Sequence, residues 1–325
     1  MNVNDSQFEL VVVIVSYNVS QSLEKCLISI KERLVGINYK VVVVDNASRD
    51  DSAVMVKRKF PECILIETGK NIGFGRGMNI GARAITAANY LLLNPDTVII
   101  NDIVGEMLVH LKQTPSAGVV GCRMLDPEGN IQPCVYSSPN LLVTLLGLLR
   151  LKKLLGFKWL TGLIRFCAAH AGLKDYVSPD REMVHWKNVQ FVPGSGFMIR
   201  GALFHHLNGY DENIFLYFED ADLFFRVRTE KLRELHLLPN TGIVHMVGKS
   251  FDLEFSDISP RKYWSMLYYF WKNNRFWEYL VIRGVLFSLA FIKILESSDP
   301  KYRDDCKRVM SMSLRGWKSF NPFPV

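Results

Sequence analysis

Three acidic side chains in four residues make Glu219-Asp220-Ala221-Asp222 the most unusual chemical feature of the sequence. Closely spaced carboxylates raise one another's proton affinity, and a carboxylate with a raised pKa can act as a general base near neutral pH. An acidic first turn that complements a helix dipole is the ordinary alternative. The cluster is therefore a candidate for proton transfer, and other residues must decide between the two interpretations.

Two more carboxylates each follow an apolar run. Asp45 comes directly after Lys40–Val44, and Asp96 lies in the turn Asn94-Pro95-Asp96 that follows Tyr90–Leu93. The Asp45 carboxylate could accept hydrogen bonds from a nucleobase imide or a ribose hydroxyl. Asp96 could bind a hard divalent cation, which commonly shares its oxygen ligands with substrate phosphates. Turn and N-cap aspartates are the competing interpretations at both positions.

A glycine-rich segment and a histidine segment could contact phosphate. The stretch Asn71-Ile72-Gly73-Phe74-Gly75-Arg76-Gly77 would let the backbone approach a diphosphate, with a tight turn as the equal alternative. Its spacing does not fit a dinucleotide-binding fingerprint. Neutral His245 could ligate a metal, while Lys249 and Ser250 could hold phosphate oxygens. A lone histidine is more often structural, so only its combination with the acids makes it a candidate.

The elements around these segments predict an α/β fold. Apolar, β-branched runs alternate with helical stretches, and the runs are Leu10–Val15, Lys40–Val44, Ile64–Glu67 and Tyr90–Leu93. This order predicts a doubly wound, mostly parallel sheet, in which ligands bind beyond the carboxyl ends of the strands. Asp45 and Asp96 both lie at such ends.

The remaining elements are predicted from shorter signals. The helix after the glycines is expected to run to about Ala88, and the turn at 126–130 is expected to form the tip of a hairpin. Phe191–Arg200 and the short segment Gly242–His245 are predicted strands, and Asp220–Glu230 is a predicted helix.

Bulk properties limit the class of protein. The 325 residues are 49% hydrophobic and 22% charged, which is enough for one large α/β domain with an appendage. The net charge of +7 suits anionic partners without choosing among them. The six scattered cysteines form no disulfide framework, which favours a reducing compartment. Because we find neither a signal peptide nor a stretch long enough to span a bilayer, we expect a soluble or peripheral protein.

Taken in order, these segments resemble the motifs of the family 2 glycosyltransferases of the GT-A fold, in particular their bacterial rhamnosyltransferase-type branch. The resemblance extends from about Leu10 to Phe251, and the ordered combination is specific although each motif is weak alone. The matching stretches are VVVIVSYN, VVVVDNAS, NIGFGRGMN, LLLNPDT, VPGSGFMIRGALF, GYDENIFLYFEDADLFFRVR and HMVGKSF.

The resemblance implies a role for each matching residue. Asp45 would bind the base or ribose of a nucleotide-sugar donor, and Asp96 with His245 would bind Mg²⁺ or Mn²⁺. Asp220 would be the catalytic base, with Glu219 and Asp222 as alternatives. Asn94-Pro95-Asp96 departs from the family's more general Asp-x-Asp motif, and the rhamnosyl branch shares this departure. The other implied donor-binding residues are Ser16, Tyr17, Asn18, Asn71, Gly73, Arg76, Asn94, Lys249 and Ser250.

The resemblance also implies the reaction. It is inversion by single displacement, with L-rhamnose from dTDP-rhamnose as the preferred donor sugar and a UDP-hexose as the alternative. The implied acceptor is a saccharide, lipid-linked, in the synthesis of a cell-surface polysaccharide.

We expect a GT-A nucleotide-sugar-binding domain over residues 1–255 and a basic, aromatic helical extension over 256–325. The domain would carry a leucine-rich basic insertion at about 140–170. The insertion and the extension both have the composition of elements that lie in a membrane interface, and packing on the protein core is the alternative. The expected location is the cytoplasm, peripheral at the inner face of the cytoplasmic membrane.

Two other classes of protein fit less well. A sugar nucleotidyltransferase would need a glycine-rich, basic loop after the first strand, where this chain has Ser16-Tyr17-Asn18-Val19-Ser20. A non-catalytic nucleic-acid or interaction protein would need basic and aromatic residues interleaved over one face. Because the acids at 219–222 would repel phosphates in the absence of a metal, we expect no nucleic-acid partner.

Overall fold

The apolar runs of the N-terminal half form the parallel part of one eight-stranded sheet. In this computed structural model, residues 8–132, 138–149, 188–230, 233–246 and 259–322 are described. Their strands are ordered β3-β2-β1-β4-β7-β6-β8-β5. The first four are parallel neighbours: β1 (Phe8–Ser16), β2 (Tyr39–Asp45), β3 (Ile64–Glu67) and β4 (Ala87–Leu93).

The other half of the sheet has mixed directions. Strand β7 (Gly196–Arg200) is antiparallel to both β4 and β6 (Ala117–Leu125). Strand β8 (Glu234–His245) is parallel to β6, and β5 (Thr97–Ile99) pairs antiparallel with the end of β8. The pairing of β5 with β8 places Thr97 opposite His245, which brings the segment after β4 beside the last strand.

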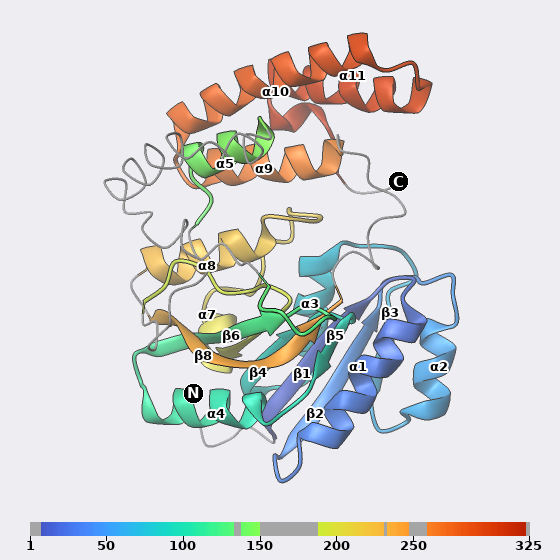
Figure 1. Ribbon diagram of the computed structural model, residues 1–325, viewed down its shortest axis with the longest axis vertical. Helices are drawn as coiled ribbons and strands as arrows, with labels where there is room; N and C mark the ends of the chain where they lie inside the picture. The colour runs from blue at the N-terminus through green and yellow to red at the C-terminus, as the bar shows by residue number, and fades with distance from the viewer. Residues whose placement is uncertain (1–7, 133–137, 150–187, 231–232, 247–258, 323–325) are drawn as a thin grey trace.

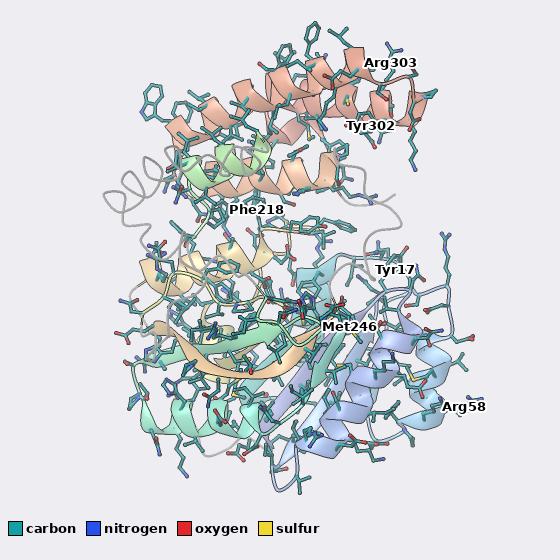
Figure 2. The ribbon with its side chains drawn as sticks, viewed as in Figure 1. Tyr17, Arg58, Phe218, Met246, Tyr302 and Arg303 are labelled. Carbon is teal, nitrogen blue, oxygen red and sulfur yellow. The ribbon has the colours of Figure 1, made fainter. Side chains whose placement is uncertain are left out.

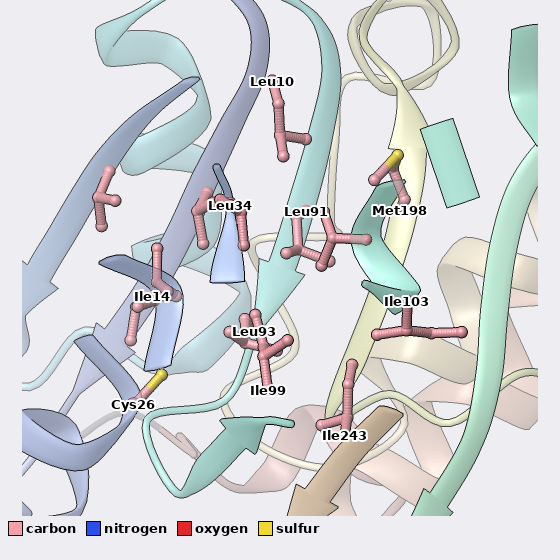
Figure 3. Packing of buried hydrophobic residues seen from close by; sticks show 14 of the residues in the cluster. Leu10, Ile14, Cys26, Leu34, Leu91, Leu93, Ile99, Ile103, Met198 and Ile243 are labelled. Atoms are coloured by element: carbon pink, nitrogen blue, oxygen red, sulfur yellow. The ribbon is translucent and has the colours of Figure 1, made fainter. Parts of the chain in front are cut away.

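Helices cover both faces of the sheet because successive β1 side chains point to opposite sides. Leu10, Val12 and Ile14 pack with helices α1 (Ser20–Arg33), α2 (Ser52–Lys59) and α4 (Ile103–Gln113), as Figure 3 shows in part. Val11, Val13 and Val15 lie in a second core, on the opposite face. The helices of that face are α3 (Phe74–Ala84), α7 (Gly201–His206) and α8 (Glu219–Thr229).

A third hydrophobic core belongs to the C-terminal helices, which form a separate layer above the sheet in Figure 1. They are α9 (Pro260–Lys272), α10 (Phe276–Glu296) and α11 (Pro300–Arg315), followed by a short 3₁₀ turn at Trp317–Ser319. Helices α9 and α11 each begin with a proline after a capping Ser259 or Asp299, a favourable start for a helix. Helix α5 (Leu141–Leu148) packs against this layer.

Several predicted boundaries were wrong. Helix α3 ends at Ala84 because β4 begins at Ala87 and pairs with β1 from its first residue. The predicted strand Phe191–Arg200 is a strand only from Gly196, and Gly242–His245 is the end of the much longer β8. The turn at 126–130, by contrast, is closed by an antiparallel bridge between Leu125 and Ile131, as at the tip of a hairpin, and residues 133–137 lie outside the described part of the chain.

The leucine-rich insertion is described only as far as residue 149, where α5 and its last turn end, and residues 150–187 lie outside the described part of the chain. Within the residues described, no helix is both long and apolar enough to cross a membrane.

Candidate active site

Two buried polar atoms that have no hydrogen-bond partner within the described part of the chain lie at the carboxyl ends of β1 and β2. Ser16 and Asp45 are directly opposite each other in the strand register, and their exposed fractions are 0% and 4%. The Asp45 Oδ2 atom accepts a hydrogen bond from the Ser48 amide at 3.0 Å, but Asp45 Oδ1 and Ser16 Oγ find no partner among the described residues. Because an unpaired buried polar atom costs free energy, this pair indicates a place for a hydrogen-bonding ligand.

The loops around this pair are held together by hydrogen bonds between the ends of β1 and β2. The Asn18 amide donates to Ser48 Oγ at 3.0 Å, and the Arg49 amide donates to Asn18 Oδ1 at 2.7 Å. Asn18 has a left-handed backbone with φ of 56°, and Tyr17 beside it is half-buried near the upper edge of the sheet (Figure 2). Tyr17 and Asn18 thus border the unpaired atoms of Ser16 and Asp45.

Asn46, which sequence reasoning missed, fixes the glycine-rich segment to the end of β2. Its amide nitrogen donates to Asn71 Oδ1 at 3.0 Å, and its amide oxygen accepts from the Ile72 backbone at 3.0 Å. Asn71 Oδ1 also accepts from the Gly73 amide at 3.1 Å. The sequence signal for Asn46 was its position directly after an aspartate at the end of an apolar run.

The glycines of this segment allow close packing within the protein. A Cβ on Gly73, whose φ is 93°, would lie 2.6 Å from the Phe215 carbonyl oxygen, and one on Gly77 would lie 2.8 Å from a Val15 methyl carbon. Arg76 is held by the Glu212 carbonyl, to which its Nε donates at 2.6 Å. The segment therefore joins β1 to the stretch that precedes α8.

Asp96 and His245 lie together, as the interpretation of a shared metal site requires. Asp96 is 5% exposed, and its Oδ1 is 3.5 Å from His245 Nε2. The Met246 amide donates to the Asp96 carbonyl at 2.9 Å, and Gln132 contacts both Nδ1 and the carbonyl of His245. Gln132 thus orients the imidazole from its far side and leaves Nε2 directed at the carboxylate.

This pair fits a divalent cation that shares its ligands with a substrate. A nitrogen and an oxygen 3.5 Å apart can both contact one cation at about 2.0–2.2 Å. Among the described residues no group of three or more metal-ligating side chains is found, so phosphate oxygens and water would supply the remaining ligands. Lys249 and Ser250 lie outside the described residues.

The segment 193–196 links the Asp96 turn to the acidic cluster. The Asn94 amide donates to the Ser195 carbonyl at 2.9 Å, so the end of β4 is tied to this turn. A Cβ on Gly194 would lie 1.9 Å from Asp220 Oδ2. Gly194 therefore leaves the Asp220 carboxylate the space it occupies, and any larger residue would displace it.

Asp220 and Glu219 form a coupled carboxylate pair at the start of α8. Asp220 Oδ1 accepts a hydrogen bond from the buried Tyr210 hydroxyl at 2.8 Å. Burial raises the pKa of Asp220 to about 6, and this hydrogen bond opposes the rise. Burial and the charge of Asp220 raise the pKa of Glu219 to about 8. Both shifts favour the protonated form, so this pair binds a proton more readily than ordinary carboxylates do, as a general base near neutral pH requires.

Asp222 has a different environment. It is 0% exposed, and its two oxygens contact Arg226 Nε at 2.8 Å and Lys272 Nζ at 2.7 Å. Lys272 also contacts Asp211 at 2.6 Å, so Asp222 belongs to an ion-pair network that connects α8 to α9. This arrangement favours a structural role for Asp222 and leaves Asp220 as the base candidate.

Two aromatic residues directly before the acids have left-handed backbone conformations. Tyr217 has a φ of 62° and Phe218 has a φ of 68°. This conformation costs a residue with a bulky side chain on the order of 1–3 kcal/mol, and such outliers concentrate at functional sites. The surrounding packing imposes the conformation, so no sequence pattern could have predicted it.

Ser16 and Asp45 at the strand ends, the Asp96–His245 pair and the Glu219–Asp220 carboxylates are the candidate site residues that the structure describes. The sheet on which they lie, parallel in one half and mixed in the other, is typical of the GT-A glycosyltransferases. The chain belongs to glycosyl transferase family 2, whose model matches residues 11–173.

Similar proteins agree with this classification. The N-acetylglucosaminyl-diphospho-decaprenol L-rhamnosyltransferase of Mycobacterium tuberculosis is 28% identical over 228 residues, which cover 66% of this chain and 68% of the relative. The low-salt glycan biosynthesis hexosyltransferase Agl10 of Haloferax volcanii is 24% identical over 69% of this chain and 63% of its own.

Solved structures show the same fold. The mannosyltransferase PcManGT of Pyrobaculum calidifontis, in complex with GDP-Man and Mn²⁺, has a TM-score of 0.55 at 13% identity, covering 95% of this chain and 88% of its own. S. aureus TarS 1-349 in complex with UDP has a TM-score of 0.51 at 14% identity, covering 96% and 72%. The predicted GT-A fold and family are thus confirmed.

Proposed function

We propose that this glycosyltransferase transfers L-rhamnose from dTDP-rhamnose, with inversion, to a hydroxyl of a lipid-linked saccharide. The observation that supports the proposal is the position of the Asp220 carboxylate, which contacts the Tyr210 hydroxyl and lies against Gly194, in the segment tied to the Asn94–Asp96 turn. The rhamnosyl donor and the lipid-linked acceptor are supported by the name of the Mycobacterium tuberculosis relative. A UDP-hexose is the alternative donor, since a TarS structure in the comparison contains UDP-GlcNAc and has a TM-score of 0.50.

In this mechanism Asp220 accepts the proton of the acceptor hydroxyl while that oxygen attacks the anomeric carbon. The new glycosidic bond forms as the bond to the donor phosphate oxygen breaks, and the electron pair leaves with the nucleoside diphosphate. A Mg²⁺ or Mn²⁺ held by Asp96 and His245 would stabilise the charge on that leaving group. In the same mechanism Ser16 and Asp45 hold the nucleoside, and Lys249 and Ser250 bind the diphosphate. The loops around the donor are shaped by Tyr17, Asn18, Asn71, Gly73, Arg76 and Asn94.

A transfer assay tests the proposal. The protein is incubated with radiolabelled dTDP-rhamnose or UDP-hexoses and a short-chain polyprenyl diphosphate N-acetylglucosamine, with Mg²⁺ or with EDTA. We expect metal-dependent label transfer from dTDP-rhamnose. The anomeric configuration of the product should be opposite to that of the donor. A product that retains the donor configuration would refute the inverting mechanism, and transfer from a UDP-hexose alone would replace the donor.

The C-terminal helices supply a surface for peripheral contact with an anionic membrane. Residues 256–325 contain twelve lysines and arginines against six acids, and thus account for six of the seven net positive charges. Helix α10 buries Tyr279, Ile282 and Leu286 on its inner face. Its outer face is also apolar: Trp277 is 77% exposed and Leu295 is 71% exposed.

No charged residue lies on this outer face. At 3.6 residues per turn, its apolar side chains occupy an arc of about 120°, opposite the buried face. A helix that is apolar on two opposite faces needs cover on both. We therefore propose that the outer face of α10 lies in the membrane interface, with tryptophan at the level of the headgroups. The outer face comprises Trp277, Leu280, Val281, Gly284, Ser288, Phe291, Ile292 and Leu295.

Sedimentation with vesicles tests this surface. We expect the protein to sediment with vesicles that contain anionic phospholipid, and a Trp277→Glu/Leu295→Glu variant to lose most of this binding. The matched control is Val54→Glu/Val109→Glu, which adds the same charge at exposed positions of α2 and α4 and should bind like the wild type. Equal sedimentation of both variants would exclude α10 as the docking face.

A further inference from the structure

A cavity of about 650 Å³ lies between α5 and the C-terminal helices. Its wall is mostly apolar and includes Val143 of α5, Met266 of α9, Leu286 of α10 and Val309 of α11. Sites for small molecules commonly have volumes of about 300–1,000 Å³ and mostly apolar linings. The cavity is therefore large enough for a ligand, and its chemistry suits a hydrocarbon.

One lining residue of the cavity is next in sequence to the acidic cluster. Phe218, which lines the cavity, directly precedes the carboxylates of Glu219 and Asp220. Figure 2 shows Phe218 between α8 and the layer that contains α5 and α9. Phe218 and its neighbour Tyr217 both have the left-handed backbone described above. The base candidate Asp220 therefore comes two residues after a residue of the cavity wall.

Positive charge lies at this same junction. Lys262 lines the cavity, and its Nζ lies 5.5 Å from the centre of the Tyr217 ring. The Arg261 guanidinium lies over the Phe215 ring at 5.0 Å. These two cations therefore contact the segment that leads to Asp220, and one of them also lines the cavity, so they could bind a diphosphate attached to a hydrocarbon.

The outer wall of the cavity belongs to the helix proposed to face the membrane. Leu286 and Ala290 line the cavity from the inner face of α10, opposite the exposed apolar face. A lipid leaving the interface would therefore meet the cavity directly behind α10.

We propose that the cavity binds the isoprenoid chain of a diphosphate-linked acceptor, with the diphosphate at Lys262 and Arg261 and the sugar at Asp220. This inference rests on the proposed lipid-linked acceptor and assigns the site that recognises its lipid.

Two exposed helical positions offer a pair of variants. Gly147 lines the cavity, and an added Cβ there meets no atom within 4 Å. Gly147→Phe places a large side chain at the cavity, whereas Val54→Phe adds an aromatic side chain on α2, where Val54 is 62% exposed. Gly147→Phe raises helix propensity and Val54 is exposed, so neither replacement is expected to unfold its helix.

Binding is measured by titration calorimetry in the absence of detergent and donor, with farnesyl diphosphate, isopentenyl diphosphate and pyrophosphate as probes. We expect farnesyl diphosphate to bind the wild type and Val54→Phe at least tenfold more tightly than pyrophosphate, and Gly147→Phe to lose that advantage. Isopentenyl diphosphate, which has one isoprene unit, should bind the wild type only slightly more tightly than pyrophosphate does. A Lys262→Gln variant should weaken all three probes together.

The inference is overturned if farnesyl diphosphate binds no better than pyrophosphate, or if Gly147→Phe binds it like the wild type. A separate titration with dTDP distinguishes this failure from failure of the proposed function. Binding of dTDP without farnesyl diphosphate removes only the cavity assignment, and the reverse result removes the rhamnosyl donor.

Discussion

Replacement of Asp220 by asparagine is the sharpest test of the catalytic assignment. Asparagine keeps the size of the side chain and can still contact the Tyr210 hydroxyl, which lies 2.8 Å from Asp220 Oδ1. It cannot accept a proton from an acceptor hydroxyl. Removal of a general base costs about 10²–10⁴-fold in rate. We therefore expect Asp220→Asn to lower kcat by about that factor and to leave donor affinity within about twofold.

The pH dependence of the wild type supplies a second readout. Burial raises the pKa of Asp220 to about 6, so the base is protonated below that pH and free above it. The value of kcat/KM, which reports the ionisation of the free enzyme, should fall tenfold for each pH unit below about 6. The remaining activity of Asp220→Asn should lack this acidic limb.

The assay measures radiolabelled sugar transfer from pH 5 to 9, with donor affinity measured separately by calorimetry. Asp304→Asn, an exposed change on α11, serves as the control and should behave like the wild type. If Asp220→Asn keeps more than a tenth of wild-type kcat, or keeps the acidic limb, Asp220 is not the base. A loss of thermal stability in Asp220→Asn would require Asp220→Ser as a second variant before the result is read.

Three further predictions follow from individual contacts. Tyr210→Phe removes the hydroxyl that stabilises the Asp220 carboxylate, so the acidic limb of kcat/KM should move to higher pH by about one unit, and an unmoved limb would contradict that contact. Ser16→Ala should weaken dTDP binding by about tenfold without lowering the melting temperature, because Oγ has no partner among the described residues. Ser29→Ala, which loses two internal hydrogen bonds, should lower the melting temperature and leave dTDP binding unchanged. Lys272→Met should lower the free energy of unfolding, measured in urea, by on the order of 2–3 kcal/mol, because it removes one of the two cations that contact buried Asp222. Lys31→Met, at an exposed ion pair, should change this free energy by less than about 0.5 kcal/mol.

Patterns local to the chain predict the framework of this molecule. The apolar runs before Asp45 and Asp96 are strands β2 and β4, and the parallel order places their carboxyl ends at one edge of the sheet. His245 was associated with Asp96 through the family's motif order, and the structure places the two side chains 3.5 Å apart. Their proposed roles still depend on the experiments above.

Features that arise from packing between distant segments could not be predicted. The glycines at 73 and 77 suggested phosphate binding. Their small size also allows the close contact of Gly73 with Phe215 and of Gly77 with Val15, and no local pattern in the sequence indicates these contacts. Similarly, the sequence left Asp222 as an alternative to Asp220 for the catalytic base. Only the folded arrangement shows that Lys272, fifty residues further on, forms an ion pair with Asp222 and that Tyr210 contacts Asp220.

The most direct test of the central claim is a thermal-shift panel of dTDP-rhamnose, UDP-glucose, UDP-galactose and GDP-mannose, each with Mn²⁺ and with EDTA. A ligand that binds only the folded protein raises its melting temperature by mass action. We predict a clear rise with dTDP-rhamnose that is larger with Mn²⁺ and is reduced by His245→Ala. If the folded protein shows no shift with any of the four donors, the nucleotide-sugar site proposed at Ser16, Asp45 and Asp96 is contradicted.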